Sequence, residues 1–196
     1  MTTLALIRHG PTAWNTEGRL QGRADIPLSP DGEAALAGRR LPPPFSGMAA
    51  YSSPLVRARR TAALLGIRAV TIEPRLTELD WGEFEGRTVD DLRARYGAGM
   101  AANEARGLDF RPPGGESPRD MQKRIRPFLN DLAESRRSAI AVTHKGMIRA
   151  ILALATGWDM MGRQPVKLDW RCLHAFTLDG DGTPSVARLN IALEGP

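Results

Sequence analysis

The chain has 196 residues, of which 42% are hydrophobic and 25% are charged, and its formal net charge is +5. This length suits one well-cored domain, and the composition is typical of a globular protein rather than a disordered or fibrous one. No apolar run reaches membrane-spanning length, and the N-terminus lacks the basic and apolar regions of a secretory signal. We therefore expect a cytoplasmic protein that does not act at a membrane.

The cysteine content and the basic charge narrow the possible partners. Cys172 is the only cysteine, which excludes an intramolecular disulfide and a cysteine-rich zinc site. The basic residues are mostly arginines spread along the chain, with no run longer than two. Because no aromatic-rich RNA-binding pattern or helix-turn-helix motif accompanies them, we expect no nucleic-acid partner. A preference for small anionic molecules explains the basic charge as well as a nucleic-acid partner would.

Apolar runs separated by turn residues predict strands that alternate with helices. Leu4–Ile7 is apolar at successive positions, which is typical of a buried strand in a mostly parallel sheet. Ser29 as the N-cap and Pro30 at the first helical position predict a helix that runs to about Arg40. A turn-rich break follows over residues 41–47.

The same pattern repeats in the next segment. Residues 48–53 predict a second strand that ends in serines. Ser53 as the N-cap and Pro54 after it predict a helix that Gly66 closes. Residues 69–74 then predict a short third strand.

The middle of the chain is less regular. A loop over residues 76–88 precedes a helix over 88–97. Residues 97–118 are rich in glycine and proline, so we expect an irregular surface excursion or lid. Ser117 caps a long helix after it, in which Pro127 predicts a kink.

The last third of the chain completes an α/β pattern. Residues 138–144 predict a buried strand, and a helix with an apolar face follows until Gly157. Residues 172–182 and 185–193 predict a terminal pair of strands. The alternation predicts a three-layer α/β/α sandwich with a mostly parallel central sheet, in one domain over residues 1–196.

Polar side chains follow three of the predicted strands where each strand ends. Arg8 and His9 end the first, Arg57 lies one helical turn beyond the second, and His144 ends a later one. Ligands of open α/β sheets bind at the carboxyl ends of the strands, so these residues are expected to converge. Arginine forks match phosphate oxygens, and the N-termini of the following helices add N–H donors. The polar residues at any one of these strand ends, taken alone, are more often structural. Together, the residues at the three strand ends predict a phosphoryl-binding site.

Six motifs along nearly the whole chain support a family resemblance. They are RHGPTAWN (8–15), QGRADIPLSPDGEAALAG (21–38), YSSPLVRARRTA (51–62), LTELDWGEFEG (76–86), PPGGES (112–117) and VTHKGMIRAIL (142–152). In this order they resemble the histidine phosphatase superfamily, which includes the cofactor-dependent phosphoglycerate mutases. PPGGES resembles a segment that is frequent in the phosphatase branch.

The resemblance implies a role for each residue at the strand ends. His9 is expected to be the nucleophile that becomes a phosphohistidine, with Arg8, Arg57 and His144 binding the phosphoryl oxygens. Glu78 occupies the place of the acid that protonates the leaving group. Independent chemistry agrees, because a neutral imidazole attacks phosphorus, cations offset the transferring charge, and a carboxylic acid of raised pKa can donate a proton.

Further residues are expected to border the substrate. The resemblance implies that Asn15 contacts the phosphate and that Gln21 and Gly22 lie in a loop beside the substrate. Lys145 departs from the family pattern, which commonly has glycine after the second histidine. A positive φ there would strain lysine. The Lys145 ammonium could instead reach a second anionic group of the substrate, although a solvent-facing side chain is the simpler interpretation.

Several other titratable residues are expected to be structural. Glu83 and Glu85 belong to the same acidic loop as Glu78 and are interpreted as a solvated face. His174 lies within a predicted strand and suits a core or surface position better than a ligand position. We therefore expect neither a metal nor a cofactor.

These observations predict a metal-independent phosphatase that hydrolyses small phosphorylated metabolites through a phosphohistidine on His9. The alternative is a phosphoglycerate mutase-type phosphotransferase. By the family resemblance, members of the mutase branch have a longer chain and an acid loop of the E-R-H-Y-G type. This chain has ELDWGEFEG in that loop. A non-catalytic phosphate-binding module is a weaker alternative, because both histidines are present. The sequence leaves the physiological substrate and the oligomeric state open.

Overall fold

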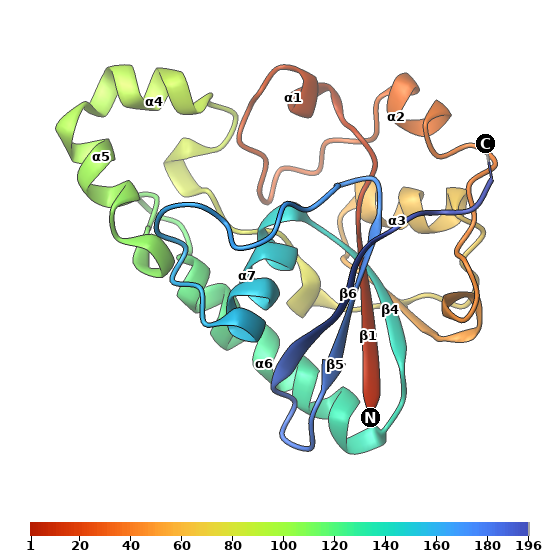
Figure 1. Cartoon of the computed structure of the whole chain (residues 1–196). Coiled ribbons are helices and arrows are strands. Elements are labelled where there is room, and N and C mark those ends of the chain that lie inside the picture. Colours follow the sequence, from red (N-terminus) through yellow and green to blue (C-terminus); the bar gives the residue numbers. More distant parts are fainter. Residues whose placement is uncertain (196) are drawn as a thin grey trace.

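Successive residues of the strand β1 (Thr2–Arg8) face opposite sides of the sheet, and both sides are buried. Leu4 and Leu6 join one hydrophobic core, whereas Ala5 and Ile7 join the other. In the computed structural model, which describes residues 1–195, β1 therefore lies inside a sheet that is covered on both faces (Figure 1). The predicted buried strand is confirmed.

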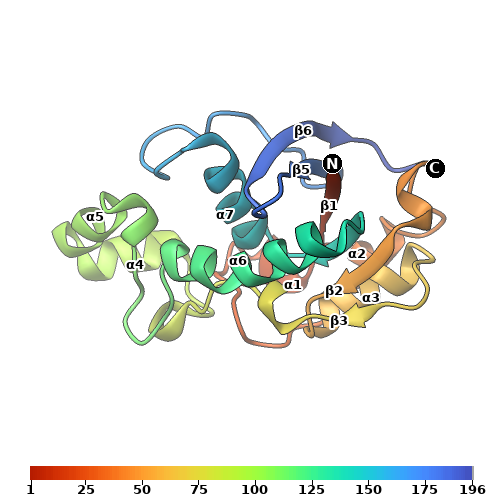
Figure 2. The same ribbon diagram turned by 90° about the horizontal axis from the view of Figure 1, so that it is seen from below.

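Six strands form one sheet in the order β3-β2-β4-β1-β5-β6. Besides β1, they are β2 (Ala49–Ser52), β3 (Thr71–Ile72), β4 (Ala139–Thr143), β5 (Leu173–Leu178) and β6 (Pro184–Ile191). The first four strands in this order run parallel to one another, and β5 and β6 are added antiparallel. Figure 2 shows β5 and β6 at one side of β1 and β2 and β3 at the other. The mostly parallel sheet is confirmed.

Helices cover each face with a separate apolar core. The helices α6 (Pro118–Ser135) and α7 (Lys145–Thr156) pack on the Leu4 and Leu6 side of β1. The helix α3 (Val56–Leu64) packs on the Ala5 and Ile7 side. α6 is one helix that includes Pro127, the residue at which a kink was predicted. Gly157 ends α7 in the left-handed conformation, as predicted. No helix of the described residues is long and apolar enough to cross a membrane.

Two helices differ from their predicted bounds, beginning with α2 (Pro30–Ala34). Ser29 caps it as expected, but it ends well before Arg40. Leu36 N donates to Glu33 O, so the chain tightens into a turn directly after the helix. The apolar spacing alone does not show this early end.

The second difference concerns the start of α3. This helix begins at Val56, with Leu55 rather than Ser53 at the N-cap, and no side chain caps it. The Ser53 hydroxyl lies 2.7 Å from His144 Nε2 instead. The prediction of Ser53 as the N-cap was therefore wrong, because its hydroxyl contacts His144 and accepts only from Leu55 N, at 3.4 Å, before the helix begins.

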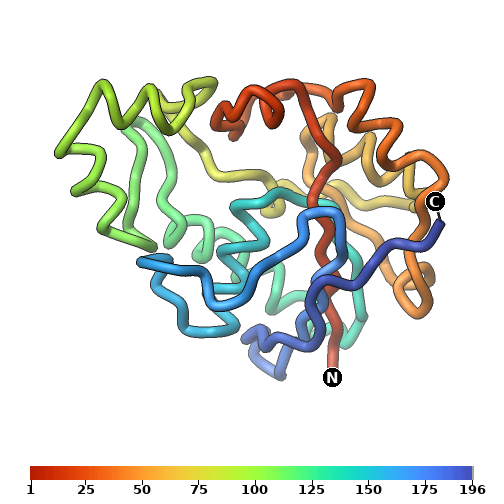
Figure 3. The backbone as a smooth tube through the Cα atoms, turned by 45° about the horizontal axis from the view of Figure 1, so that its top comes forward, coloured from red at the N-terminus to blue at the C-terminus, as the bar shows by residue number. Residues whose placement is uncertain are grey.

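The segment 97–118 and α4 (Val89–Tyr96) lie beyond α7, on the side of the sheet that α6 and α7 cover, as Figures 2 and 3 show. It was predicted to be irregular, but it contains the helix α5 (Ala98–Glu104) and a 3-10 turn over Gly107–Asp109. The segment folds because it has a small core of its own. That core consists of Phe84, Leu92 and Met100, with Leu20, Trp81 and Phe110 packed against it.

Replacement of Ser117 by alanine tests the N-cap of α6. The Ser117 hydroxyl accepts from Asp120 N and the Ser117 N–H donates to the Asp120 carboxylate, which makes a capping box. We expect Ser117→Ala to lower the free energy of unfolding by about 1 kcal/mol in urea denaturation. Ser46 is exposed, and Ser46→Ala should change the free energy by less than about 0.5 kcal/mol. Equal losses in both variants would contradict the capping role.

Candidate active site

The parallel pairing of β1 with β4 brings two histidines together. Arg8 lies opposite Thr143 in the register of the two strands, and His9 N donates to Thr143 O at 2.9 Å. His9 and His144 each follow directly on their strand, and their ring centroids are 5.1 Å apart. The sequence prediction that these strand ends converge is therefore matched by the geometry.

The His9 ring is held in one tautomer. Its Nδ1 lies 2.7 Å from Gly10 O, which only accepts hydrogen bonds, so Nδ1 carries a proton. Burial, followed by the charges of Arg8 and Arg57, holds the pKa of His9 well below its usual value. The ring is therefore neutral near pH 7, and the lone pair lies on Nε2. A neutral imidazole with a free Nε2 can act as a nucleophile.

His144 is fully buried, and its ring is also neutral. Burial, then the neighbouring His9, Arg57 and Arg8, hold its pKa well below the usual value. Its Nε2 lies 2.7 Å from the Ser53 hydroxyl, whereas its Nδ1 has no hydrogen-bond partner among the described residues. A buried polar atom of this kind can bind an oxygen of a ligand.

Two arginines concentrate positive charge beside the histidines. Arg57, at the start of α3, is fully buried and donates to Ala24 O at 2.8 Å and to Gly22 O at 2.7 Å. Neither Arg8 nor Arg57 forms an ion pair with a described acid, and the Nε of each has no partner there. Burial lowers the pKa of both guanidiniums, which nevertheless stay charged. This arrangement favours a multiply charged anion.

Glu78 is buried next to this cationic cluster. Its carboxyl accepts from Gly146 N at 3.0 Å and from Leu79 N at 2.9 Å. Burial raises the pKa of Glu78, and these two hydrogen bonds together with Arg57 and Arg8 oppose that effect. The raised pKa suits a carboxyl group that exchanges a proton during a reaction.

Gly146 allows this close approach. A Cβ on residue 146 would lie 2.3 Å from Glu78 Oε1, so only glycine fits beside the carboxyl group. Its neighbour Lys145 is not among the residues with a positive φ, so the expected strain at Lys145 is absent. The Lys145 side chain is exposed, and its Nζ lies 5.5 Å from the centroid of the Trp170 ring.

The loop after β1 is organised around Thr12. Asn15 and Thr12 form a capping box at the short helix α1 (Ala13–Thr16), so the Asn15 side chain is engaged with the backbone. The Thr12 hydroxyl donates to Gln21 Oε1 at 2.9 Å, which leaves the buried Gln21 Nε2 without a described partner. The free amide of Gln21 is thus a better placed donor for a ligand than the amide of Asn15, which was expected to contact the phosphate.

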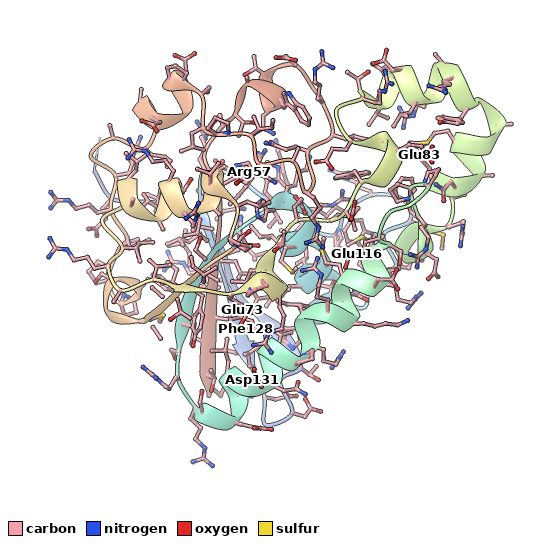
Figure 4. All side chains as sticks on the ribbon, turned by 180° about the vertical axis from the view of Figure 1, so that it is seen from behind. Arg57, Glu73, Glu83, Glu116, Phe128 and Asp131 are labelled. Carbon is pink, nitrogen blue, oxygen red and sulfur yellow. The ribbon has the colours of Figure 1, made fainter. Side chains whose placement is uncertain are left out.

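The sequence prediction missed the role of Glu85. Its carboxylate accepts from Gly22 N at 2.9 Å and Ala24 N at 2.6 Å, and the carbonyls of these two residues accept from Arg57. Glu85 therefore holds the loop that positions Arg57, and the interpretation as a solvated face was wrong. Glu83 is exposed, as expected, and lies far from Arg57 in Figure 4.

Thr61 is a second residue that sequence reasoning missed. Its hydroxyl donates to Arg57 O at 2.7 Å and accepts from Gly10 N at 2.9 Å. It thereby joins α3 to the turn that follows His9. A threonine within an arginine-rich helix gives no motif of its own, so only the fold identifies this contact.

His174 is buried in β5, as its place in the sequence predicted. Asn190 N donates to its Nδ1 at 3.3 Å. Burial lowers the pKa of His174 to about 4. No group of three or more histidine, cysteine, aspartate or glutamate side chains within residues 1–195 is arranged to hold a metal ion.

Cavities lie on two sides of the site. His9, Arg8 and Trp170 line one of about 350 Å³. The backbone N–H groups of Leu79 and Gly146 donate hydrogen bonds to the Glu78 carboxyl group. These two residues line a second cavity, of about 570 Å³, beside the segment 97–118. Glu78 thus lies between the cationic cluster and this second cavity, whose other lining residues include Trp81, Met100 and Phe110.

Comparisons with known proteins agree with this geometry. The model of the histidine phosphatase superfamily (branch 1) matches residues 4–192. A 2,3-bisphosphoglycerate-dependent phosphoglycerate mutase of Methylobacterium radiotolerans is 36% identical over 168 residues, covering 79% of each chain. The enzyme of the same name from Azorhizobium caulinodans is 32% identical over 200 residues, covering 94% of this chain and 96% of that one.

Solved structures give the same fold. The structure of TTHB049 from Thermus thermophilus has a TM-score of 0.73 and 35% identity, and the match covers 97% of this chain and 99% of that one. A mycobacterial glucosyl-3-phosphoglycerate phosphatase, solved with VO3, has a TM-score of 0.76 and 25% identity. That match covers 98% of this chain and all of the other.

The low pKa values predict that every histidine is neutral at pH 6.5. In imidazole ¹⁵N NMR, we expect His9 to be the Nδ1–H tautomer, with an unprotonated Nε2, at this pH and above. As the pH falls, each ring gains its proton only below its usual pKa of 6.5, and His174 does so near 4. The variants His9→Gln and His144→Gln assign the signals. Protonation of half of the His9 population at pH 6.5 or higher would show that burial does not dominate the pKa of His9.

Proposed function

The chain belongs to the histidine phosphatase superfamily, branch 1, and we propose that it hydrolyses small phosphomonoesters through a phosphohistidine on His9. The observation that carries this proposal is the fixed tautomer of His9. Gly10 O holds the proton on Nδ1, and Nε2 is the free nucleophile beside two arginines that lack acidic partners. No metal ion or cofactor takes part in the proposed reaction.

The first step transfers the phosphoryl group to His9. Nε2 forms a bond to phosphorus while the bond from phosphorus to the ester oxygen breaks. Glu78 gives its proton to that oxygen, which leaves as an alcohol. Arg8 and Arg57 offset the charge on the transferring oxygens, and this electrostatic stabilisation is the main source of catalysis in phosphoryl transfer.

The second step releases phosphate to water. Glu78, now a carboxylate, accepts a proton from a water molecule whose oxygen attacks phosphorus. The bond from phosphorus to His9 Nε2 breaks, and the ring becomes neutral again. Both His9 and the Glu78 carboxyl group return to their initial protonation states.

His144 and Gln21 supply further donors to the phosphoryl oxygens. The Ser53 hydroxyl accepts from Leu55 N at 3.4 Å, and it can donate its own hydrogen bond to His144 Nε2. The proton of the neutral His144 ring is then on Nδ1, the atom without a described partner. The segment 97–118 covers the leaving group, since Met100 and Phe110 line the cavity beyond Glu78.

A phosphoglycerate mutase is the second candidate, and the names of the curated relatives favour it. In a mutase, a hydroxyl of phosphoglycerate rather than water accepts the phosphoryl group from His9. The acid loop supports hydrolysis, because ELDWGEFEG differs from the E-R-H-Y-G type of the mutase branch. One solved relative is also named as a phosphatase. Both candidates use the same His9 chemistry.

Substitution of His9 tests the shared chemistry and separates the two candidates. During turnover of a ³²P-labelled monoester with EDTA present, the wild-type protein should carry acid-labile ³²P and release phosphate. His9→Ala should do neither, because it has no Nε2. With 3-phosphoglycerate and a trace of 2,3-bisphosphoglycerate, a hydrolase releases phosphate faster than it forms 2-phosphoglycerate, and a mutase does the reverse. Near wild-type turnover by His9→Ala would end the phosphohistidine mechanism.

Substitution of Glu78 tests the proton donor. An alkoxide leaving group needs a proton in the transition state, whereas p-nitrophenolate leaves without one. General acid catalysis contributes roughly 10²–10⁴-fold, so Glu78→Gln should lose kcat/KM on this scale with alkyl phosphates. The loss with p-nitrophenyl phosphate should be much smaller. His144→Ala is the matched control and should be impaired equally on both substrates. If Glu78→Gln is impaired equally on both, Glu78 is not the proton donor.

A further inference from the structure

Four cationic side chains line a groove beside the site without any carboxylate among its lining residues. They are Lys145, Arg149, Arg163 and Lys167, and the groove has a volume of about 700 Å³. None of them forms an ion pair with a described acid. On the opposite side of the molecule, by contrast, Arg75 pairs with Glu73 and Asp131, the two acids that Figure 4 labels beside Phe128. The groove therefore concentrates positive charge, and Glu78 is the acid whose charge acts on Lys145 and Arg149.

Trp170 connects this groove to the phosphoryl site. Its ring lies 6.0 Å from Arg8 Cζ and 5.5 Å from Lys145 Nζ. Trp170 also lines both the groove and the cavity that contains His9. A molecule whose phosphate is held at His9 and Arg8 would thus have the groove directly alongside it.

Arg149 supplies a buried donor that no protein group uses. Its Nε is buried and has no partner among the described residues, while its guanidinium lies 5.2 Å from the centroid of the Trp158 ring. Arg149 lines both the groove and the cavity beyond Glu78. An unpartnered guanidinium donor in this position favours a bound anion, because an unsatisfied buried donor is costly.

The far wall of the groove is fixed by Asn190. Its Oδ1 accepts from Asp169 N at 2.7 Å, and its Nδ2 donates to Lys167 O at 3.0 Å. These two bonds attach the segment that carries Lys167 and Trp170 to the end of β6. The groove is therefore built into the fold.

We propose that this groove is a second anion subsite, which binds a carboxylate or phosphate group of the molecule whose other phosphate is attacked by His9. The proposal rests on the proposed function, and it specifies the substrate class as phosphomonoesters with a second anionic group. Lys145 and Arg149 are its central contacts. Arg163 and Lys167 add long-range attraction from the exposed rim.

Matched substrate pairs test the proposal. Glycerol 3-phosphate and 3-phosphoglycerate differ by a hydroxymethyl group against a carboxylate. The monophosphate and bisphosphate of propane-1,3-diol differ by a second phosphate. Wild-type kcat/KM should be at least about tenfold higher for the doubly anionic member of one pair or both, as one charge-assisted contact provides. The pair with the larger ratio identifies which anion the groove takes.

Variants of the groove should reduce this preference. Lys145→Gln and Arg149→Gln should each lower the ratio of kcat/KM within a pair about tenfold, and Arg149→Lys should restore part of it. Arg68→Gln removes the same charge from an exposed position outside the groove and should keep the wild-type ratio. Because Lys145 is exposed, Lys145→Gln is the variant least prone to fail in folding.

Two outcomes overturn the subsite. One is a wild-type ratio near one for both pairs, and the other is an unchanged ratio in both Lys145→Gln and Arg149→Gln. Release of no phosphate from any of the four compounds would instead count against the proposed function. In that case, calorimetric Kd values for the same pairs and variants still decide the subsite, with the same ratios expected.

Discussion

The parallel pairing of β1 with β4 is the constraint on which the site depends. Its register places Arg8 opposite Thr143, so that His9 and His144 leave the sheet side by side. A slip of one residue would move one histidine by about 3.3 Å and turn its side chain to the other face of the sheet. Both faces of this pair are buried under separate cores, so the apolar pattern of the two strands fixes the register and, with it, the geometry of the reacting groups.

Charge at this edge of the sheet is concentrated by the same burial that stabilises the fold. Arg57 is fully buried without an acidic partner, and its cost is offset by carbonyls of a loop that Glu85 holds in place. Burial, together with the charges of the arginines, lowers the pKa of both histidines and keeps them neutral, which is the form proposed to attack or donate. A dianionic phosphate brings the missing negative charge. The free protein thus carries an electrostatic strain that its proposed substrate relieves.

Local signals in the sequence predicted the strands and the residues at their ends, because an apolar run and the polar residue after it are neighbours in the chain. These local signals failed where a tertiary contact decides the role of a residue. Ser53 looks like a cap but bonds to His144, and Glu85 looks solvated but holds the loop under Arg57. α5 was missed because its stability comes from packing on Phe84 and Leu92 rather than from a strong helical pattern. Trp170 and Asn190 lie in no motif, and only the fold brings them to the site.

The residues that local sequence signals predict and the residues that only the fold brings to the site have different proposed roles. The groups proposed to act on phosphorus come from strand ends and the segments that follow them, where a small motif fixes both identity and position. The groups proposed to contact the rest of the substrate come from the segment 97–118, which has a core of its own, and from the segment around Trp170, which hydrogen bonds to Asn190 hold in place. Arg149 lines both the groove and the cavity beyond Glu78, and it lies on α7, whose N-cap is His144. In the proposed reaction, a substrate that extends from His9 into the cavity beyond Glu78 passes the Glu78 carboxyl group, so binding of its far end at Arg149 also places its ester oxygen at the proton donor.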